Sequence, residues 1–417
     1  MKSRNNFVLL FSIVLCLDLH ATGKIKLSLQ QADSMFLANN FSLLASSMNI
    51  EAQKAQILQA KLYPNPTIGT DFNVYDPDNK QIFHIGSSGE KDFQFNQLIL
   101  MGGKRKTEIE MAKTNATIAE LEFQQLIRQL RYKLHSDLFS VGLQQFLLEK
   151  YNKQLALIDT LLSSYQVQAD KGNVPLKDLV RLKAEYLQLN DNRAEIFKQY
   201  CETQSDLQTL LQTPFNIEFE FTESEISDYI RLHDYEELKS EAMKNRPDLN
   251  IMQQNQLLAQ QYLQLQKRMN IPDVNLLLSY DQRGNAFQNQ VNGGISLPIP
   301  IWDRNKGNIK TAEFKKKQTE YDLAELKAEI MADLQNSYTF YSQTVTEYKK
   351  LMKLYNQDFE TTVNGMTDNF QKRNISIVEF VDFFEAYNEV LTELTRIKTQ
   401  LVLSGEQLNL LVGKDIY

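Results

Sequence analysis

The sequence contains few cysteines and histidines, residues that form disulfides, bind metal ions or take part in catalysis. It contains two cysteines and four histidines among 417 residues. Cys16 lies in the N-terminal segment, so Cys201 is the single thiol once that segment is removed, and no intramolecular disulfide can then form. The histidines are isolated, with no Cys or His at the spacing of metal ligands, and phosphate-loop, dinucleotide and nucleophile-elbow motifs are missing. We therefore expect no enzyme, no tightly bound metal and no cofactor.

Long hydrophobic runs and positive charge are also missing. After residue 25 no stretch approaches the roughly 18 apolar residues of a transmembrane helix. The net charge of −7 argues against a general nucleic-acid binder. Glycine and proline are few, 15 and 9, and they cluster near residues 64–103 and 271–307. The sequence therefore predicts long helices that are interrupted twice.

The N-terminus has the pattern of a secretory signal peptide. Lys2 and Arg4 precede an apolar run from Phe7 to Leu17, which is too short to span a bilayer. We expect cleavage after Ala21, so the mature chain is exported. Cys16 leaves a lipoprotein open as an alternative, although the bulky Leu15 stands where a small residue is usual.

The chain repeats itself. Lys171-Gly172-Asn173-Val174 recurs as Lys372-Arg373-Asn374-Ile375, displaced by 201 positions. Nearer the N-terminus, Asn39 to Leu43 match Asn245 to Leu249 with a displacement of 206. A duplicated chain is an architectural signature. The expected organisation is a signal peptide at 1–21, a first repeat at 22–212, a connecting segment at 213–234 and a second repeat at 235–417.

Each repeat should contain three helices. Apolar residues recur every seven positions from Ile127 to Leu162, and at alternating intervals of three and four from Met331 to Phe359. This is a coiled-coil seam, and it implies left-handed supercoiling against a partner helix. In each repeat a half-length helix precedes the long one and a return helix follows it. The expected ranges are 28–62, 104–171 and 175–212, then 235–269, 305–372 and 376–411.

The interruptions alternate apolar and polar residues with a period of two. Ile68 and Phe72 share one face and Asp71 the other, and Leu276 and Leu278 oppose their polar neighbours in the same way. Strands of about ten residues with one apolar face match outer-membrane barrels. The expected strands are 66–76, 91–101, 273–281 and 290–301.

Four strands are too few to close a membrane barrel. An unpaired edge in lipid is prohibitive, and the smallest barrels need about eight strands. Two copies of the chain would give a filled barrel, and three would give twelve strands with room for a pore. The alternative is a small β-domain on a coiled coil, which would make the chain a periplasmic adaptor or scaffold without a membrane barrel.

The order of these elements resembles the TolC-type outer-membrane efflux family. The resemblance covers residues 25–413 and includes both tip motifs, Asn65-Pro66 at a strand entry and Gly102-Gly103-Lys104-Arg105 at a strand exit. It implies a mainly α fold with a β-barrel part. A homotrimer would share one twelve-stranded barrel in the outer membrane of a Gram-negative bacterium, continued by a helical periplasmic tunnel with residues 213–234 as an equatorial belt.

The resemblance also implies a function. The protein would be the passive exit duct of a tripartite efflux system, with a periplasmic adaptor (membrane fusion protein) and an inner-membrane transporter as partners. It would export small molecules or cations, with no catalysis of its own. The exit duct of a protein-secretion system shares this body plan and stays open, and the sequence does not identify the cargo.

Candidate site residues follow from the same resemblance. Acidic residues after the second tip line the periplasmic aperture in the family, and they correspond to Glu379 and Asp382, with Asp178 and Arg181 at the equivalent positions of the first repeat. Phe380 and Phe383 are expected in the seam, so the two carboxylates should lie one turn apart beside it. A solvated helix flank is the plainer explanation. The candidates for adaptor contact are Gly172, Asn173, Val174, Arg373, Asn374 and Ile375. The needs of a tight turn alone would also explain these residue types.

Overall fold

The computed structural model describes residues 23–284, 286–355, 358–372 and 374–417. The expected signal peptide with Cys16, and Arg373 of the second tip, lie outside the described residues. The chain divides into two compact units, each built from separate stretches of sequence. The first contains the described residues up to Phe36 together with Asp137–Phe221, and the second contains Leu37–Ser136 with Thr222–Tyr417. The long helix α3 (Lys104–Asp170) contributes residues to both.

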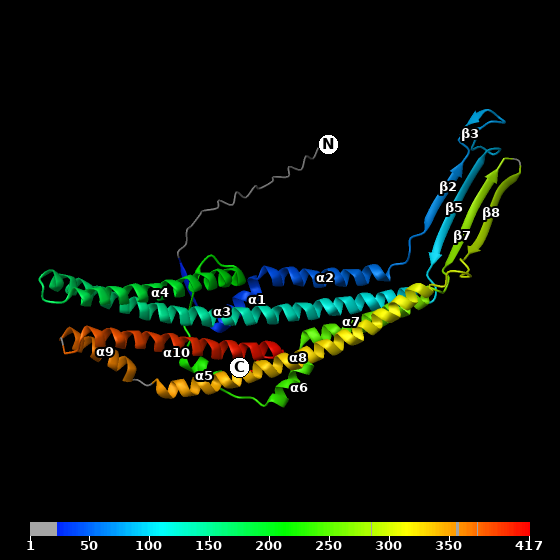
Figure 1. The fold of residues 1–417 in the computed structure, drawn as a ribbon. Helices are drawn as coiled ribbons and strands as arrows, with labels where there is room; N and C mark the ends of the chain where they lie inside the picture. Colours follow the sequence, from blue (N-terminus) through cyan, green and yellow to red (C-terminus); the bar gives the residue numbers. More distant parts are fainter. Residues whose placement is uncertain (1–22, 285, 356–357, 373) are drawn as a thin grey trace, which may run out of the picture. The chain divides into compact units, whose positions relative to one another are not determined.

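In the first unit, the end of α3 and the helix α4 (Leu176–Leu211) form an antiparallel hairpin (Figure 1). In the same unit, β1 (Lys24–Leu27) and β6 (Asn216–Phe219) pair in parallel. Most of α1 (Leu29–Asn39) also belongs here. Gly142, the single glycine of α3, explains how strand and helix come so close. A Cβ atom at this position would lie 2.9 Å from both the carbonyl oxygen of Phe219 and the ring of Phe221.

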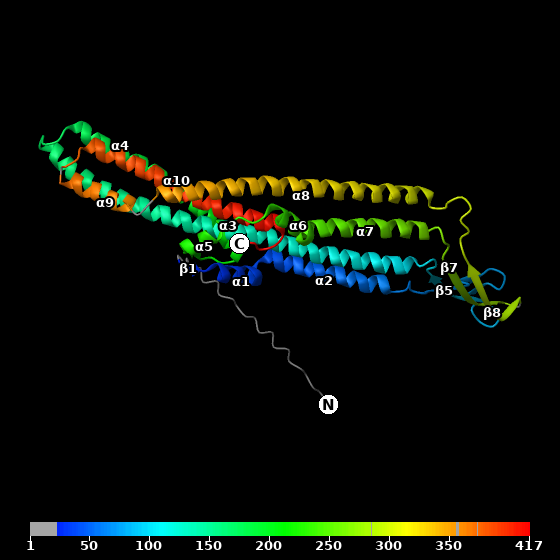
Figure 2. The ribbon, with the colours of Figure 1, turned by 90° about the horizontal axis from the view of Figure 1, so that it is seen from below.

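The second unit contains the remaining helices. Figure 2 shows α7 (Pro247–Arg268) lying along α8 (Lys306–Leu354), and α8 also packs against α10 (Ile377–Val412). The side chains of Leu334, Tyr341 and Val345 on α8 are almost fully buried, as the seam pattern predicted. The other helices of this unit are α2 (Phe41–Lys61), α5 (Glu223–Asp228), α6 (Tyr235–Asn245) and α9 (Asp358–Gln371).

Three helices expected to be continuous are broken, which corrects the ranges 28–62, 235–269 and 305–372. The Asn40 side chain accepts a 3.1 Å hydrogen bond from the Leu43 backbone and starts α2 as its cap. Pro247 occupies the first turn of α7, where its missing N–H costs nothing, so a new helix starts there. Between α8 and α9, Tyr355 has an extended backbone, in a stretch rich in the weak helix formers Asn, Asp and Thr.

Four strands of the second unit form one antiparallel sheet. Its order is β2 (Thr67–Phe72), β5 (Glu90–Ile99), β7 (Val274–Arg283) and β8 (Phe287–Ser296), so the hairpins of the two repeats pair with each other through β5 and β7. Two of the expected ranges are corrected. The strand expected at 290–301 ends at Ser296, because Pro298 and Pro300 cannot donate ladder hydrogen bonds. The strand expected at 66–76 ends at Phe72, and β3 (Tyr75–Asp76) instead pairs with β4 (Gln81–Ile82) as a small hairpin.

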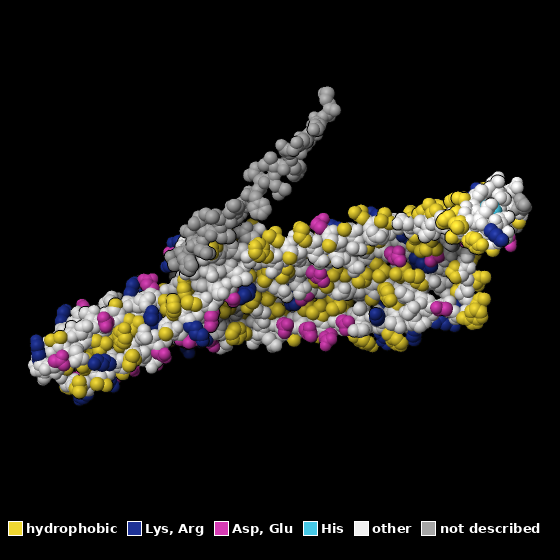
Figure 3. All heavy atoms as spheres, turned by 90° about the horizontal axis from the view of Figure 1, so that it is seen from above, with side chains coloured by type: hydrophobic (Ala, Val, Ile, Leu, Met, Phe, Trp, Pro, Cys, Tyr) yellow, Lys and Arg dark blue, Asp and Glu magenta, His cyan; other side chains and the backbone are white. Residues whose placement is uncertain are grey.

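One face of the sheet is apolar and open. In register, Ile68 pairs with Phe95, and Phe95 pairs with Leu278, so these side chains share a face. All three are exposed, by 79%, 41% and 53%. Figure 3 shows hydrophobic side chains gathered in the region of the sheet. No described helix is both long enough and apolar enough to cross a membrane.

A salt bridge ties the two strand–helix junctions together. Asp273, just before β7, accepts a 2.8 Å hydrogen bond from the backbone of Met101 and lies 2.8 Å from the ammonium group of Lys104. The Lys104 side chain is only 5% exposed, so this pair is shielded from water. The arrangement fixes the start of α3 at the foot of the sheet.

Candidate functional site

The tip of the first unit is closed by Asn173. Its backbone N–H donates to the Gln168 carbonyl at 2.9 Å, and its side-chain amide donates to the Gln168 side-chain oxygen at 2.8 Å. Gly172 has a φ of +74°, which a side chain disfavours, and nothing lies near the position of its missing Cβ. Val174 is half-buried. The tip is a defined turn with an open glycine.

The tip of the second unit uses the same bonds, 201 positions later. The backbone N–H of Asn374 donates to the Asn369 carbonyl at 2.8 Å, and its side-chain amide donates to the Asn369 side-chain oxygen at 3.1 Å. Ile375 is half-buried, like Val174. In both tips the asparagine amide is therefore engaged within the turn, so Asn173 and Asn374 shape the tips from inside.

Glu379 has a structural task that the sequence analysis missed. Ser376 is the N-cap of α10, and its hydroxyl accepts a 3.3 Å hydrogen bond from the Glu379 backbone. In return the Glu379 carboxylate accepts a 2.8 Å hydrogen bond from the Ser376 backbone, which completes a capping box. This backbone N–H, and then the Ser376 hydroxyl, hold the pKa of Glu379 below its ordinary value. The signal, serine followed three residues later by glutamate, is present in the sequence.

The seam beside Glu379 differs by one position from the expected one. Phe380 and Phe384 are fully buried, whereas Phe383 is half-buried, so Phe384 rather than Phe383 continues the seam. Phe380 stacks on Phe370 of α9 with ring centroids 4.2 Å apart. Glu379 and Asp382 are both exposed. They lie one turn apart on the open side of α10.

The equivalent helix start of the first unit has different chemistry. Pro175 stands where the second repeat has Ser376, and it makes no side-chain capping bond. Asp178, the counterpart of Glu379, is half-buried in the first turn of α4, where the helix dipole stabilises a negative charge. Arg181, the counterpart of Asp382, is exposed. The two helix starts thus differ in both cap and charge.

A buried polar pair in the second unit was not foreseen. The Tyr229 hydroxyl, from the segment after α5, donates a short hydrogen bond to the Glu406 carboxylate on α10, and both residues are 4% exposed. Burial, and then the charge of Glu406, raise the pKa of Tyr229. Gly405 leaves room for the tyrosine ring. Since 177 positions separate the partners, no local sequence signal could have found them.

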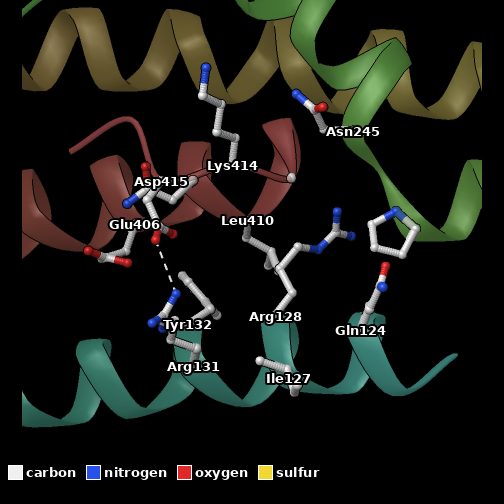
Figure 4. Close-up of a pocket in the computed structure, with 13 residues that line it drawn as sticks. Gln124, Ile127, Arg128, Arg131, Tyr132, Asn245, Glu406, Leu410, Lys414 and Asp415 are labelled. Atoms are coloured by element: carbon white, nitrogen blue, oxygen red, sulfur yellow. Dashed lines mark hydrogen bonds and ion pairs between the residues drawn. The ribbon is translucent and has the colours of Figure 1, made fainter. Parts of the chain in front are cut away.

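A polar cavity of about 280 Å³ lies nearby, between α3, the α6–α7 junction and the end of α10 (Figure 4). Arg131 forms a 3.1 Å ion pair with Asp415 at its edge. Arg128 is mostly buried, and desolvation lowers its pKa. Among the described residues, no group of three or more His, Cys, Asp or Glu side chains is arranged to hold a metal ion.

Comparison with known proteins adds relatives. Residues 238–414 match the family model described as outer membrane efflux protein. The chain is 25% identical over 300 residues to the cobalt-zinc-cadmium resistance protein CzcC of Cupriavidus metallidurans, across 71% of this chain and 68% of that one.

Solved structures share the fold at low sequence identity. The outer membrane channel CmeC of Campylobacter jejuni superposes with a TM-score of 0.75 at 12% identity, covering 93% of this chain and 87% of that one. The open state of the MtrE outer membrane channel of Neisseria gonorrhoeae gives 0.73 at 14% identity, covering 93% and 89%.

Proposed function

This chain belongs to the TolC-type family of outer membrane efflux proteins, and from that premise we propose that three copies of it form the exit duct of a tripartite efflux pump. It is an outer-membrane channel with a helical periplasmic extension. The observation that carries the proposal is the sheet β2-β5-β7-β8, whose exposed apolar face suits lipid and whose strands continue into coiled-coil helices. Its edges β2 and β8 need partners, and two further copies supply them.

The tips are the proposed contacts with a periplasmic adaptor. Gly172 has open space around it, and Val174 and Ile375 present apolar surface next to each turn. Arg373 adds a positive charge at the second tip. Because the amides of Asn173 and Asn374 are engaged within the turns, their part is to set the shape that the adaptor meets.

The proposed aperture is built from the N-terminal turns of α4 and α10, the helices that follow the two tips. In a trimer, Glu379 and Asp382 would form two rings of negative charge, which favours cations in a constriction. Asp178 and Arg181 would carry the opposing contacts of the first repeat. The exposure of Glu379 and Asp382 supports a role toward a lumen. The capping box fixes the direction of Glu379 and so limits how far its carboxylate can reach.

Among small molecules and cations, divalent metal cations are the cargo that we propose first. The support is the similarity to a protein named for cobalt, zinc and cadmium resistance. The acidic helix starts suit a cationic cargo as well. A passive duct cannot drive transport by itself, so an inner-membrane transporter would supply the energy for export.

Expression in a Gram-negative host tests the proposal. The protein should fractionate with the outer membrane and migrate as a trimer that dissociates on heating. Purified trimers should conduct ions in planar bilayers, and deletion of the gene in its own host should lower tolerance to zinc, cobalt or cadmium. A periplasmic monomer without channel activity would contradict the duct. If the trimer conducts ions but deletion of the gene has no effect on metal tolerance, the channel function stands and metal cations are excluded as its cargo.

A further inference from the structure

The polar face of the sheet carries a row of aspartates at one level. Asp71 of β2 pairs with Asp92 of β5, and Asp92 pairs with Asp281 of β7. The row ends at Gln290 of β8, which pairs with Asp281. Directly paired residues lie on the same face with Cβ atoms about 5 Å apart. Three carboxylates therefore stand side by side, on the face opposite Phe93 and Tyr280.

This row is unfavourable unless something positive compensates it. Like charges directly opposite each other on neighbouring strands destabilise a sheet. One rung away on the same face, Glu90 adds a further carboxylate and Arg283 a guanidinium. The Arg283 Nε atom lies 3.3 Å from both the Glu90 and the Asp281 carboxylates. One guanidinium thus faces four carboxylates, and it reaches neither Asp71 nor Asp92 in any ion pair among the described residues.

The environment of Asp92 shows directly that compensating groups are lacking. The residue is only 8% exposed, and its Oδ1 atom is buried without a hydrogen-bond partner among the described residues. A buried carboxylate oxygen without a donor is costly. The adjacent strands offer it the carboxylates of Asp71 and Asp281, which cannot donate when ionised. A mobile cation is the group that can compensate both the missing partner and the repulsion.

We propose that Asp71, Asp92 and Asp281 form a cation-attracting level inside the barrel, separate from the aperture at the helix starts. The proposal rests on the proposed trimer, in which the apolar face meets lipid and the polar face lines the lumen. Three copies repeat the row around the pore as one acidic ring. Its ligands are hydrated monovalent and divalent cations, held by charge and released readily, rather than one metal ion held in a fixed coordination shell.

Ion selectivity in planar bilayers tests this level. The variant Asp71→Asn/Asp92→Asn/Asp281→Asn is compared with the parent channel under a KCl gradient. Both channels also carry Glu379→Gln and Asp382→Asn, so that the two proposed carboxylate rings on α10 contribute no charge. We expect the preference for K⁺ over Cl⁻ to fall by about tenfold. The matched control is Gln94→Ala/Ser279→Ala/Asn292→Ala, which alters the neighbouring rung of the same face without removing charge and should leave the preference unchanged.

The outcomes separate this inference from the proposed function. A conducting variant trimer with unchanged selectivity overturns the acidic level and leaves the duct intact. Parent protein that forms no conducting trimer overturns both. If the triple variant does not assemble, the single variant Asp71→Asn decides the question, because Asp71 is exposed and asparagine nearly matches aspartate in size. Asp71→Glu should then restore the selectivity that Asp71→Asn loses, and failure of both to change it counts against the proposal.

Discussion

The carboxylate of Glu379 accepts a 2.8 Å hydrogen bond from the backbone N–H of Ser376. The residue proposed for the aperture therefore also caps the helix that carries it. The proposed negative charge of the aperture and the order of the first turn of α10 therefore depend on the same side chain. Substitutions at positions 376 and 379 can separate these two tasks.

Replacing Ser376 by alanine should loosen the start of α10 without removing charge from the aperture. Loss of an N-cap hydroxyl costs about 1 kcal/mol. We expect faster hydrogen exchange at the first turn of α10 and little change in ion selectivity. The conservative variant Ser376→Thr keeps a hydroxyl at this position and should retain the cap. Equal exchange in Ser376→Ala and the parent would show that the cap does not stabilise this turn.

The cap should also weaken in acid. Because the pKa of Glu379 is lowered in the folded chain, its contribution to stability is fully present above the pKa of an unfolded glutamate, about 4.3. It is lost as the pH falls through the lower pKa of the folded state. Exchange at the first turn of α10, corrected for the intrinsic pH dependence, should rise in this range. Glu379→Gln should remove that rise, and a rise that survives the substitution would assign it to another group.

Charge at the helix starts should control conductance. Glu379→Ala with Asp382→Ala should change single-channel conductance and weaken block by multivalent cations, because two rings of carboxylates are removed. The matched control is Glu389→Ala, which removes an exposed carboxylate further along α10. Unaltered conductance and block in the double variant would assign both residues to a solvated flank.

The two asparagine turns should matter more than their exposure suggests. Asn173→Ala and Asn374→Ala each remove a side-chain hydrogen bond that closes a tip, at 2.8 Å and 3.1 Å. We expect weaker cross-linking to the adaptor and reduced metal tolerance, with trimer stability unchanged. Val174→Ala is the comparison that trims apolar surface and keeps the turn. If cells with either asparagine variant keep full metal tolerance, the shape of the tips is not needed for export.

Gly142 and Gly365 offer a matched pair of glycine-to-alanine changes inside helices. Gly142→Ala places a methyl group 2.9 Å from the Phe219 carbonyl oxygen and should destabilise the first unit by about 2 kcal/mol. Gly365→Ala meets nothing within 4 Å and should stabilise α9 by about 1 kcal/mol. Thermal unfolding followed by circular dichroism distinguishes them. Equal melting temperatures for the two variants would be inconsistent with the packing described for Gly142.

The sequence predicts the fold well where the signal is periodic. The repeat follows from displacement and the faces of the sheet from alternation, whereas the family was inferred from a resemblance in the order of elements and in short motifs. Ile68, Phe95 and Leu278 indeed share a face. The helix breaks at Asn40 and Pro247 were missed, although a cap residue and a proline mark both places.

Local chemistry was harder to predict than architecture. The capping box of Glu379 was legible in the sequence, yet the resemblance drew attention to its charge alone. Phe383 and Phe384 are adjacent and identical, so only packing decides which of them is buried. Tyr229 and Glu406 meet through tertiary structure, and the aspartate row depends on strand register, which alternation does not fix between hairpins.

The β3–β4 hairpin makes the two repeats unequal at the end of the sheet where their strands turn. His84 lies just after β4, and its Nδ1 atom is 2.6 Å from Oδ2 of Asp76 in β3. β7 and β8 are joined across residues 284–286, which is too short for such an addition. The two hairpins of the sheet therefore end differently, and in the proposed trimer each copy would present one long and one short turn at the same rim.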